Sequence, residues 1–294
     1  MTEKPITVFA PAKINLFLHI TGKRKDGYHN LDSLVVFCDI GDTITITPSS
    51  TFQFSMTGPF AKTLSHEPEA DNIVVKAAQS LSQITQNPLN LSITLQKNIP
   101  VAAGLGGGSA DAAAILWGLQ KYWDLDPTPN YLPPLMGKLG ADVPVCYHAR
   151  SAFMRGVGDE LAFCEDLPEM PVVLVNPNVA CSTKDIFLKT EDDFLKPHKD
   201  LPRSMAVPQL LNFLSKTENS LYNPAVKTVP EIENVMHALM IQDECLFHRM
   251  SGSGATCFGL FEHIESAQNA ADNVRAENPD WWVQAGMINN IQRY

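Results

Sequence analysis

Hydrophobic and polar residues alternate along several short segments in the first half of the chain. Within residues 12–20 every second residue is apolar, at Ile14, Leu16, Leu18 and Ile20. The positions between them are occupied by Lys13, Asn15, Phe17 and His19. Side chains two residues apart lie on the same face of a β-strand, so this alternation predicts a strand with one buried face. Residues 42–48 and 91–97 repeat the alternation and predict two further strands.

Between residues 48 and 91 the apolar spacing changes to that of a helix. The apolar residues recur at intervals of three or four positions, at Ile73, Ala77, Leu81 and Ile84. This spacing is typical of the buried face of an amphipathic helix. Asp71 and Asn72 come directly before it, and both are residue types that cap helix N-termini. The sequence therefore predicts a helix that begins at about residue 73.

The second half of the chain contains the same two kinds of segment. Residues 170–177 predict a short buried strand, and the polar residues 185–205 predict an exposed connection. After Pro230 the helical spacing returns at Ile232, Val235, Met236, Leu239 and Met240. Residues 255–261 and 281–287 predict strands on either side of a last helix, whose apolar positions are Ile264, Ala267, Ala271 and Val274.

The composition is that of a globular protein. The chain has 294 residues, of which 45% are hydrophobic and 18% charged, which is enough for two moderate domains or one large one. A change of character near residues 155–165 places the expected domains at 1–160 and 161–294. The formal net charge is −10. This charge argues against a general nucleic-acid-binding surface, because such a surface neutralises many phosphates with basic residues.

The cysteines and the first twenty residues indicate the cellular compartment. The six cysteines are scattered, without a C-x-x-C pair or a histidine at metal-ligand spacing, so neither a disulfide framework nor a zinc site is expected. The first twenty residues contain acid, lysine and proline where a secretory signal has an apolar stretch. No apolar run approaches ~18 residues. We therefore expect a cytoplasmic protein that does not partner a membrane.

Residues 101–116, VAAGLGGGSADAAAIL, combine a glycine-rich run with an alanine-rich segment typical of a helix. A strand is predicted before the run, and Ser109 after it is a residue type that caps helices. A flexible linker is also rich in glycine. However, a strand, a glycine loop and a helix N-terminus in this order form a phosphate cradle. Backbone N–H groups converge there with no Cβ in the way, and the helix dipole adds about half a positive charge.

Two common nucleotide-binding motifs do not fit this run. A Walker A loop requires a lysine after its last glycine, and no lysine follows Gly108. The G-x-G-x-x-G motif requires a third glycine, and Ser109 stands at that position. Instead, PVAAGLGGGSADAA resembles the phosphate loop of a superfamily of small-molecule kinases, which includes galactokinase, homoserine kinase, mevalonate kinase and phosphomevalonate kinase. One departure is Ala110, which stands where many members have a second serine.

Three further segments indicate which family within this superfamily the chain resembles. Residues 11–42, which contain KINLFL and DGYHNL, and residues 139–147, LGADVPVCY, resemble the 4-diphosphocytidyl-2-C-methyl-D-erythritol kinases of non-mevalonate isoprenoid synthesis. Residues 251–261, SGSGATCFGLF, are similar to the second glycine-rich segment of that family. The resemblance implies two α+β domains with the active site in the cleft between them. It also implies that ATP phosphorylates the 2-hydroxyl of this cytidine-bearing alcohol.

Phosphoryl transfer to an alcohol needs a group that accepts the hydroxyl proton and a charge that stabilises the developing oxyanion. Asp142, between Gly140 and Pro144, is the candidate acceptor, although an Asx turn or a helix cap would explain a lone aspartate there. Lys13 is the candidate charged partner, although a solvated strand edge would explain a lone lysine on that strand. The resemblance implies that Lys13 and Asp142 act as a pair.

Aromatic residues are candidates for holding the cytidine. Tyr28 and Phe187 are expected to sandwich the cytosine, since stacking on aromatic faces contributes ~1–3 kcal/mol per base, and His29 is expected to meet a polar edge of that base. Thr183, four residues before Phe187, and Asn15, on the first predicted strand, are further candidates for substrate contact. The six remaining histidines show no ligand or triad spacing and are interpreted as structural or surface residues.

The resemblance also assigns a nucleotide site. Asn72 and Lys97 match family positions near the adenine. The residues expected around the phosphates are Pro100, Val101, Ala102, Ala103, Gly104, Leu105, Gly106, Gly107, Gly108, Ser109 and Ala110. Mg²⁺ is expected as the ATP complex, with Ser109 as the residue that touches it. Mg²⁺ commonly keeps several waters, and no dedicated protein cage is evident.

Two other functions are compatible with the sequence. A sister kinase of the mevalonate or homoserine type shares the ATP loop but has no need of an aromatic clamp. A nucleotide-binding regulatory module would retain the loop without the chemistry, and the presence of both Lys13 and Asp142 argues against it. The sequence leaves the oligomeric state open.

Overall fold

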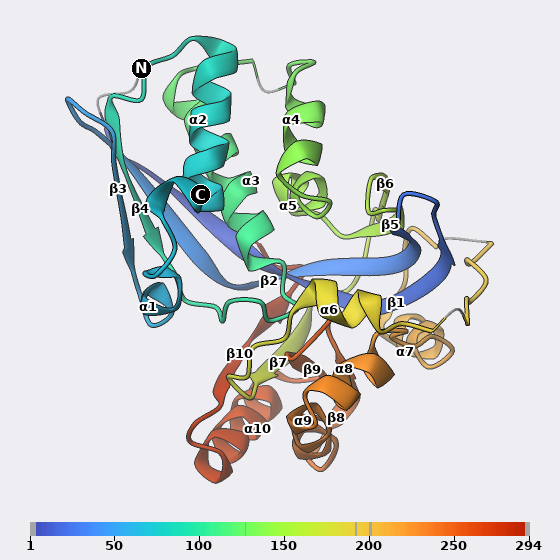
Figure 1. Cartoon of the computed structure of the whole chain (residues 1–294). Coiled ribbons are helices and arrows are strands. Elements are labelled where there is room, and N and C mark those ends of the chain that lie inside the picture. Colours follow the sequence, from blue (N-terminus) through green and yellow to red (C-terminus); the bar gives the residue numbers. More distant parts are fainter. Residues whose placement is uncertain (1–3, 127, 192, 200–201, 292–294) are drawn as a thin grey trace.

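The computed structural model describes residues 4–126, 128–191, 193–199 and 202–291. They form an upper and a lower part (Figure 1), and both parts combine strands with helices. β1 (Ile6–Lys23) and β2 (His29–Pro48) form a long antiparallel pair that runs through the junction of the two parts. Strands and helices that are segregated in this way make an α+β fold.

The upper part is a sheet covered by helices. β4 (Leu91–Gln96) pairs with β2, and β3 (Gln53–Thr57) adds to β4 in parallel. β5 (Ala152–Gly156) pairs with the other end of β2 and with β6 (Glu160–Phe163). The helices of this part are α1 (Ala61–Leu64), η1 (Glu69–Asp71), α2 (Ile73–Thr85), α3 (Gly107–Tyr122), α4 (Leu132–Leu139) and α5 (Val143–His148).

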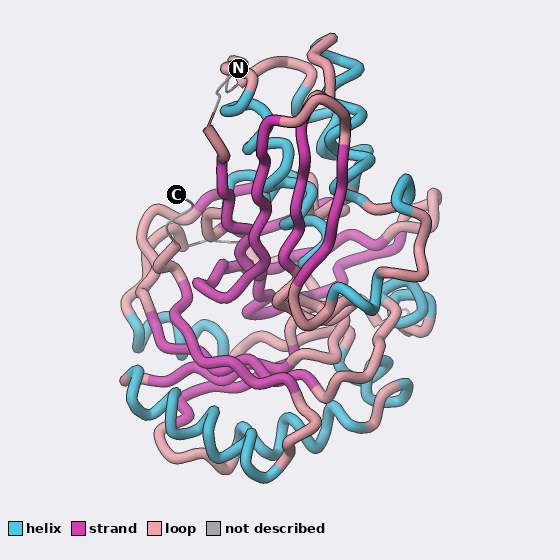
Figure 2. Tube along the Cα trace, turned by 90° about the vertical axis from the view of Figure 1, so that its left-hand side faces the viewer, coloured by secondary structure: helices cyan, strands magenta, loops and turns pink. Residues whose placement is uncertain are grey.

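The lower part is an antiparallel sheet with strand order β10-β7-β9-β8. Its strands are β7 (Met170–Asn176), β8 (Cys245–Met250), β9 (Cys257–Phe261) and β10 (Trp282–Ile288). Its helices are α6 (Thr183–Leu188), α7 (Val207–Leu214), α8 (Tyr222–Thr228), α9 (Glu231–Met240) and α10 (Ile264–Glu277). Figure 2 shows these strands lying between the upper part and a row of helices along the lower edge. The pair Ile288–Cys38 joins β10 to β2.

The buried apolar residues form three clusters, and one of them contains residues of both the upper and the lower part. It combines Ile14 and Leu34 of the β1–β2 pair with Leu174 and Leu260 of the lower sheet. Leu105 of the glycine loop is buried in the same cluster. Burial of apolar surface contributes roughly 25 cal/mol per Å² to the free energy of folding. Moving the loop would expose Leu105 to water, so this shared cluster holds the loop against both sheets.

Most of the elements predicted from hydrophobic spacing are present. The predicted strand at 12–20 lies within β1, the strand at 42–48 within β2, and the strand at 91–97 is β4. Asn72 caps α2 as expected, since its side chain accepts a hydrogen bond from the N–H of Val74 at 2.9 Å. The expected strands and helices of the second half correspond to β7, α9, β9, α10 and β10.

Four expectations are wrong in detail. Ser109 does not cap α3, because the helix already begins at Gly107 with Gly106 as its cap. Ile84 and Met240 are not core residues, being 45% and 54% exposed at the last turns of their helices. The connection 185–205 begins in α6, where Ile186 is fully buried. Residues 192, 200 and 201 of this connection lie outside the described residues.

The cysteines and the helices add two simple facts. The six cysteines are free thiols. Within the part of the chain that the structure describes, every helix is too short or too polar to cross a bilayer.

Candidate active site

The glycine loop before α3 is shaped by residues in the left-handed region of the backbone map. Gly104 has φ 74° and Gly106 has φ 64°, values that glycine adopts at no steric cost. Space is also restricted: a Cβ on Gly104 would lie 2.2 Å from the carbonyl oxygen of Ser251, and one on Gly106 would lie 3.0 Å from Cε of Lys13. The absence of side chains therefore lets this loop approach two other segments closely.

The second glycine-rich segment is one of these neighbours. Ser251 donates a hydrogen bond from Oγ to the carbonyl of Gly104 at 2.9 Å and accepts one from the N–H of Asn15 at 3.1 Å. The N–H of Thr256 donates to the carbonyl of Ala103 at 3.2 Å. The lower part of the molecule thus supports the loop from behind. The sequence indicates this segment by its glycines but points to no single residue in it.

Lys13 and Asp142 meet beside the loop. The N–H of Lys13 donates to the carbonyl of Leu105 at 2.9 Å, so β1 is joined to the loop by its backbone. The Nζ of Lys13 lies 3.1 Å from Oδ2 of Asp142 and donates to Oδ1 of Asn15 at 2.7 Å. Lys13 is only 4% exposed, so it is not on a solvated strand edge. Oδ2 of Asp142 is 3.8 Å from the position of a Cβ on Gly106.

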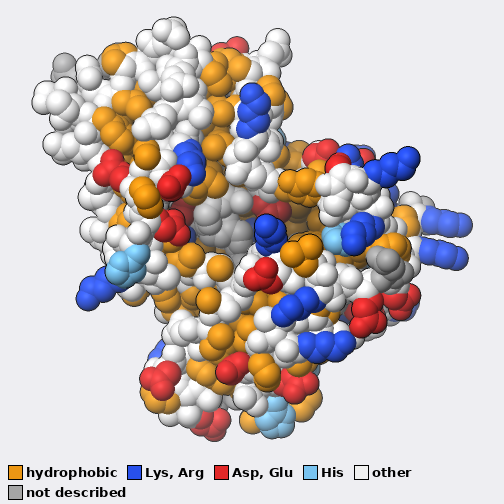
Figure 3. Space-filling model, in the orientation of Figure 1, with side chains coloured by type: hydrophobic (Ala, Val, Ile, Leu, Met, Phe, Trp, Pro, Cys, Tyr) orange, Lys and Arg blue, Asp and Glu red, His pale blue; other side chains and the backbone are white. Residues whose placement is uncertain are grey.

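Asp142 and Ser109 occupy the two helix starts that face this point. Asp142 stands at the N-cap of α5, yet its side chain makes no capping hydrogen bond. Ser109 lies in the first turn of α3, with its Oγ 3.7 Å from the position of a Cβ on Gly140. An ammonium, a carboxylate and a hydroxyl therefore border the glycine loop. Figure 3 shows this face of the molecule hollowed at the level of the N-terminal end of α3.

The two residues expected near the adenine are both buried close to the start of α3. Asn72 is buried at the start of α2, and its Nδ2 contacts Sδ of Met56 at 3.6 Å. Ile73, the next residue, lies 3.8 Å from the position of a Cβ on Gly108. Lys97 is 2% exposed and its Nζ points below the start of α3 instead of into solvent.

Lys97 is held by two aspartates that the sequence analysis did not single out. Its Nζ is paired with Oδ2 of Asp42 and, at 2.9 Å, with Oδ2 of Asp111. Burial raises the pKa of Asp111 to about 7; the negative charge of Asp42 also raises it, and the charge of Lys97 opposes the rise. Burial by itself would lower the pKa of Lys97, but the charges of Asp111 and Asp42 raise it. The available signal was an acid, Asp111, inside an alanine-rich helix.

The aromatic residues expected around the cytosine are only partly together. The ring of Phe187, on α6, stacks on the ring of His29, at the start of β2, with 5.5 Å between centroids. Tyr28 is 63% exposed. The other end of α6 approaches the second glycine-rich segment, where Oγ1 of Thr183 lies 2.8 Å from Oγ of Ser253. Helix α6 therefore connects the glycine segments with the aromatic pair.

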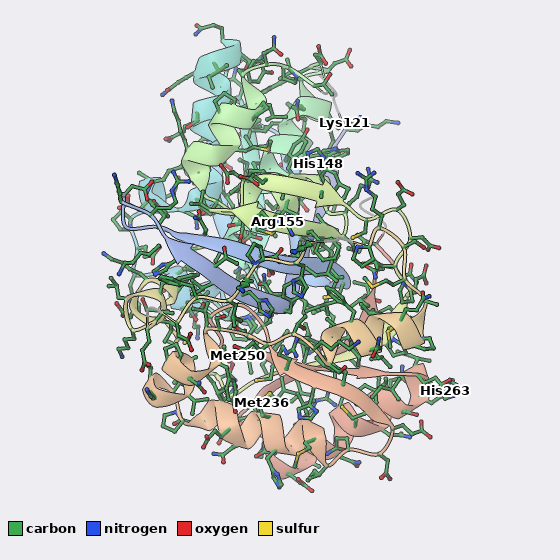
Figure 4. The ribbon with its side chains drawn as sticks, turned by 90° about the vertical axis from the view of Figure 1, so that its right-hand side faces the viewer. Lys121, His148, Arg155, Met236, Met250 and His263 are labelled. Atoms are coloured by element: carbon green, nitrogen blue, oxygen red, sulfur yellow. The ribbon has the colours of Figure 1, made fainter. Side chains whose placement is uncertain are left out.

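A second polar cluster is centred on the fully buried Asp32 of β2. Arg155, on β5 (Figure 4), donates from Nε to Oδ1 of Asp32 at 3.1 Å. His198 lies with Nδ1 2.9 Å from Oδ2 of Asp32 and donates to the same oxygen from its backbone N–H. The ring of His19 stacks on that of His198 with 5.2 Å between centroids. His198 thus joins its own segment to the buried Asp32 of β2.

Comparison with known proteins agrees with this geometry. Residues 72–150 match the model of the GHMP kinases N terminal domain, and residues 207–280 match that of the GHMP kinases C terminal domain. A protein of Agrobacterium fabrum named 4-diphosphocytidyl-2-C-methyl-D-erythritol kinase is 43% identical over 94% of both chains. Its namesake in Cereibacter sphaeroides is 47% identical over 96% of this chain and 98% of its own.

Solved structures show the same fold. A crystal structure of 4-(cytidine 5'-diphospho)-2C-methyl-D-erythritol kinase superposes with a TM-score of 0.78 and 32% identity, covering 96% of this chain and 99% of its own. Homoserine kinase from Cytophaga hutchinsonii has a TM-score of 0.69 at 17% identity, over 98% of this chain and 95% of its own, and shows the two-domain fold alone. The chain belongs to the GHMP kinase family and, within it, to the 4-diphosphocytidyl-2-C-methyl-D-erythritol kinases.

Proposed function

We propose that this protein transfers the γ-phosphoryl group of ATP to the 2-hydroxyl of 4-diphosphocytidyl-2-C-methyl-D-erythritol, a step of the non-mevalonate route to isoprenoid precursors. The observation that carries the proposal is the Lys13–Asp142 pair, 3.1 Å apart beside the glycine loop. The names of relatives at 43% and 47% identity supply the substrate. We place the reaction in the cytoplasm, in a chain divided into domains 1–160 and 161–294, with the active site in the cleft between them.

The glycine loop and the start of α3 would hold the triphosphate. N–H groups at a helix N-terminus are unpaired within the helix, and the dipole there favours anions. Pro100 to Ala110 supply this surface, and Asn72 and Lys97 border the adenine side. With glycine at 104 and 106, backbone donors can approach an anion that a Cβ would keep away.

The oxygen donors at this point fit Mg²⁺ delivered with ATP. Ser109 offers a hydroxyl in the first turn of α3, and the side chain of Asp142 is 33% exposed. The described residues contain no group of three or more His, Cys, Asp or Glu placed to bind a metal. Mg²⁺ keeps several waters and binds through phosphates plus one or two protein oxygens. When bound, the ion would neutralise phosphate charge, with Ser109 as its expected protein contact.

Asp142 and Lys13 would act on the acceptor alcohol. In-line transfer requires little covalent chemistry from the protein, so positioning and charge are what it contributes. The Asp142 carboxylate would accept the hydroxyl proton as the bond to phosphorus forms. The Lys13 ammonium, held by Asn15, would stabilise the alkoxide that develops on the same oxygen. At 4 Å such a charge contributes about 4 kcal/mol for an effective dielectric near 20.

The cytidine would bind at the other end of α6. The His29 and Phe187 rings are 5.5 Å apart, which leaves no room for a base between them. A cytosine that stacks on this face of Phe187 would replace the His29 ring, which could then meet the polar edge of the base. Tyr28, exposed beside them, would cover the second face, and Thr183 would contact the substrate nearer the glycine segments.

A direct assay tests the proposal. The purified protein is incubated with ATP, Mg²⁺ and the cytidine-bearing alcohol, and ADP release and the phosphorylated product are measured, the product by mass spectrometry. Homoserine and mevalonate serve as alternative acceptors in parallel reactions. We expect product from the cytidine-bearing alcohol alone. Turnover of homoserine or mevalonate would assign a sister kinase, and ATP binding without transfer to any alcohol would assign a regulatory module.

A further inference from the structure

Three charged side chains are buried together below the glycine loop. Asp42 is fully buried and Lys97 and Asp111 are each 2% exposed. They come from three different elements: Asp42 from β2, Lys97 from the position after β4, and Asp111 from the start of α3. Burying charges costs several kcal/mol per ion, which their mutual attraction repays only with very good geometry. Such a cluster therefore requires an explanation other than stability.

The cluster joins the two ends of the loop. Lys97 is the first residue after β4, and Asp111 follows the first turn of α3, so the 2.9 Å contact from Nζ to Oδ2 closes the base of the segment between them. Asp42 fixes the entrance: its Oδ1 accepts hydrogen bonds from the N–H groups of Asn98 at 2.6 Å and Ile99 at 3.1 Å. Its other oxygen pairs with Nζ of Lys97.

The position of the ammonium depends on a glycine. A Cβ on Gly107, the first residue of α3, would lie 3.0 Å from Nζ of Lys97 and 2.9 Å from Cδ1 of Ile99. The ammonium is thus directly against the backbone at the helix start. Two carboxylates face one ammonium, and Oδ1 of Asp111 has no hydrogen-bond partner among the described residues. A buried carboxylate oxygen without a partner costs free energy.

We propose that Asp42, Lys97 and Asp111 form a positioning unit that holds the start and the end of the glycine loop at the separation in which its amides converge on the triphosphate. The proposal rests on the proposed function, since it takes the loop as the ATP site. Asp42 and Asp111 act through Lys97 and the loop backbone and do not touch the nucleotide. Their loss therefore weakens ATP binding and leaves the binding of the acceptor alcohol unchanged.

Two substitutions of Asp111 test the unit. In Asp111→Asn the amide oxygen can still accept from Lys97, so we expect the KM for ATP to stay within about threefold of the wild type. In Asp111→Ala the tie is lost, and we expect the KM for ATP to rise about tenfold, equivalent to about 1.4 kcal/mol. The KM for the acceptor alcohol should not change in either variant. Rescue by asparagine separates loop positioning from a general loss of folding.

Control variants and a binding measurement distinguish failure of the positioning unit from failure of the proposed ATP site. Asp272→Asn removes an exposed carboxylate from the ion pair with Arg275 on α10 and should leave both KM values unchanged. If Asp111→Ala does not fold, Asp42→Asn replaces it: Asp42 uses both of its oxygens, an amide has only one acceptor oxygen, and we expect the same rise in the KM for ATP. Calorimetric titration of the wild type with ATP tests the proposed function separately: no binding there refutes the ATP site itself. The positioning unit alone is refuted by either of two results when the wild type binds ATP normally. In the first, the KM for ATP does not change in Asp111→Ala. In the second, it rises equally in Asp111→Ala and Asp111→Asn.

Discussion

Asp142 stands at the N-cap of α5, but its carboxylate pairs with Lys13 and does not cap the helix. Aspartate at an N-cap usually accepts a hydrogen bond from the backbone N–H two or three residues on. Asp142 makes no such bond, and its Oδ2 lies 3.1 Å from Nζ of Lys13. A residue in a capping position that does not cap has been placed for another contact. The site next to the glycine loop is the contact that the structure offers.

Replacing Asp142 by asparagine should abolish turnover while ATP still binds. The amide has nearly the same shape and can accept a hydrogen bond from Lys13, but it cannot take the hydroxyl proton. General-base catalysis contributes ~10²–10⁴-fold, so we expect kcat to fall by about that factor. Calorimetric ATP titration of Asp142→Asn should match the wild type. Turnover within a few-fold of normal would remove Asp142 from the role of base.

Gly106 should be intolerant of alanine. Its φ of 64° costs a residue with a Cβ about 1–2 kcal/mol, and the new methyl would press on Lys13 at 3.0 Å. We expect Gly106→Ala to weaken ATP binding and to lower kcat together, because the loop and Lys13 are displaced at once. Both quantities are measured in the steady-state assay.

Gly137 is the matched control for that substitution. It lies within α4, and a Cβ there has open space within 4 Å. Alanine is favoured over glycine in a helix interior by about 1 kcal/mol, so Gly137→Ala should raise the thermal midpoint and leave the kinetics intact. If Gly106→Ala leaves ATP binding and kcat unchanged, as Gly137→Ala should, then the close approach of the loop to Lys13 is not needed for activity.

Phe187→Ala should raise the KM for the cytidine-bearing alcohol and leave the KM for ATP unchanged. Loss of a stacking partner costs ~1–3 kcal/mol per base, which corresponds to a factor of about 5–150 in binding. Leu188→Ala is the control on the same helix, because Leu188 is 72% exposed. A rise in the KM for ATP alone would show that the two pockets have been exchanged in the proposal.

How far the sequence predicts this site depends on whether a residue's neighbours are near it in the chain. Asn72 caps the helix that directly follows it, and the sequence predicts this. Lys13 and Asp142 are far apart in the chain, and only the family resemblance paired them. Asp42 and Asp111 were missed because an acid is interpreted as exposed unless its partner is known, and Lys97 is distant from both in sequence.

The errors have local physical reasons as well. Ser109 was expected to cap α3, but glycine can adopt φ 64°, and Gly106 caps the helix three residues earlier than the pattern indicates. The placing of Tyr28 and Phe187 around the cytosine stays a prediction; without a base, the ring that stacks on Phe187 is that of His29, while Tyr28 is 63% exposed. Hydrophobic spacing gives the face of a strand or helix, but it does not tell which of two adjacent aromatic residues turns inward.

His19 should make the stability of the fold depend on pH. Its imidazole is buried, with Nε2 accepting from the N–H of Glu218 at 3.1 Å. Burial is the main cause that lowers its pKa to about 4; His198 and Arg249 lower it further and Asp32 opposes them. The unfolded chain takes up a proton near pH 6.5, while the folded chain does not until about pH 4. Stability is therefore lost as the pH falls between these two values, by up to about 1.4 kcal/mol per pH unit.

The variant His19→Gln isolates this contribution, because its side-chain oxygen can replace Nε2 as an acceptor and does not titrate. Other groups also titrate in this range, so the quantity to measure is the difference between the two proteins. Urea unfolding of both, at intervals from pH 4 to pH 8, should give a difference in free energy that is constant above pH 6.5. Below pH 6.5 the wild type should lose stability faster than the variant. Parallel curves down to pH 4 would mean that His19 is protonated as readily in the folded chain as in the unfolded one.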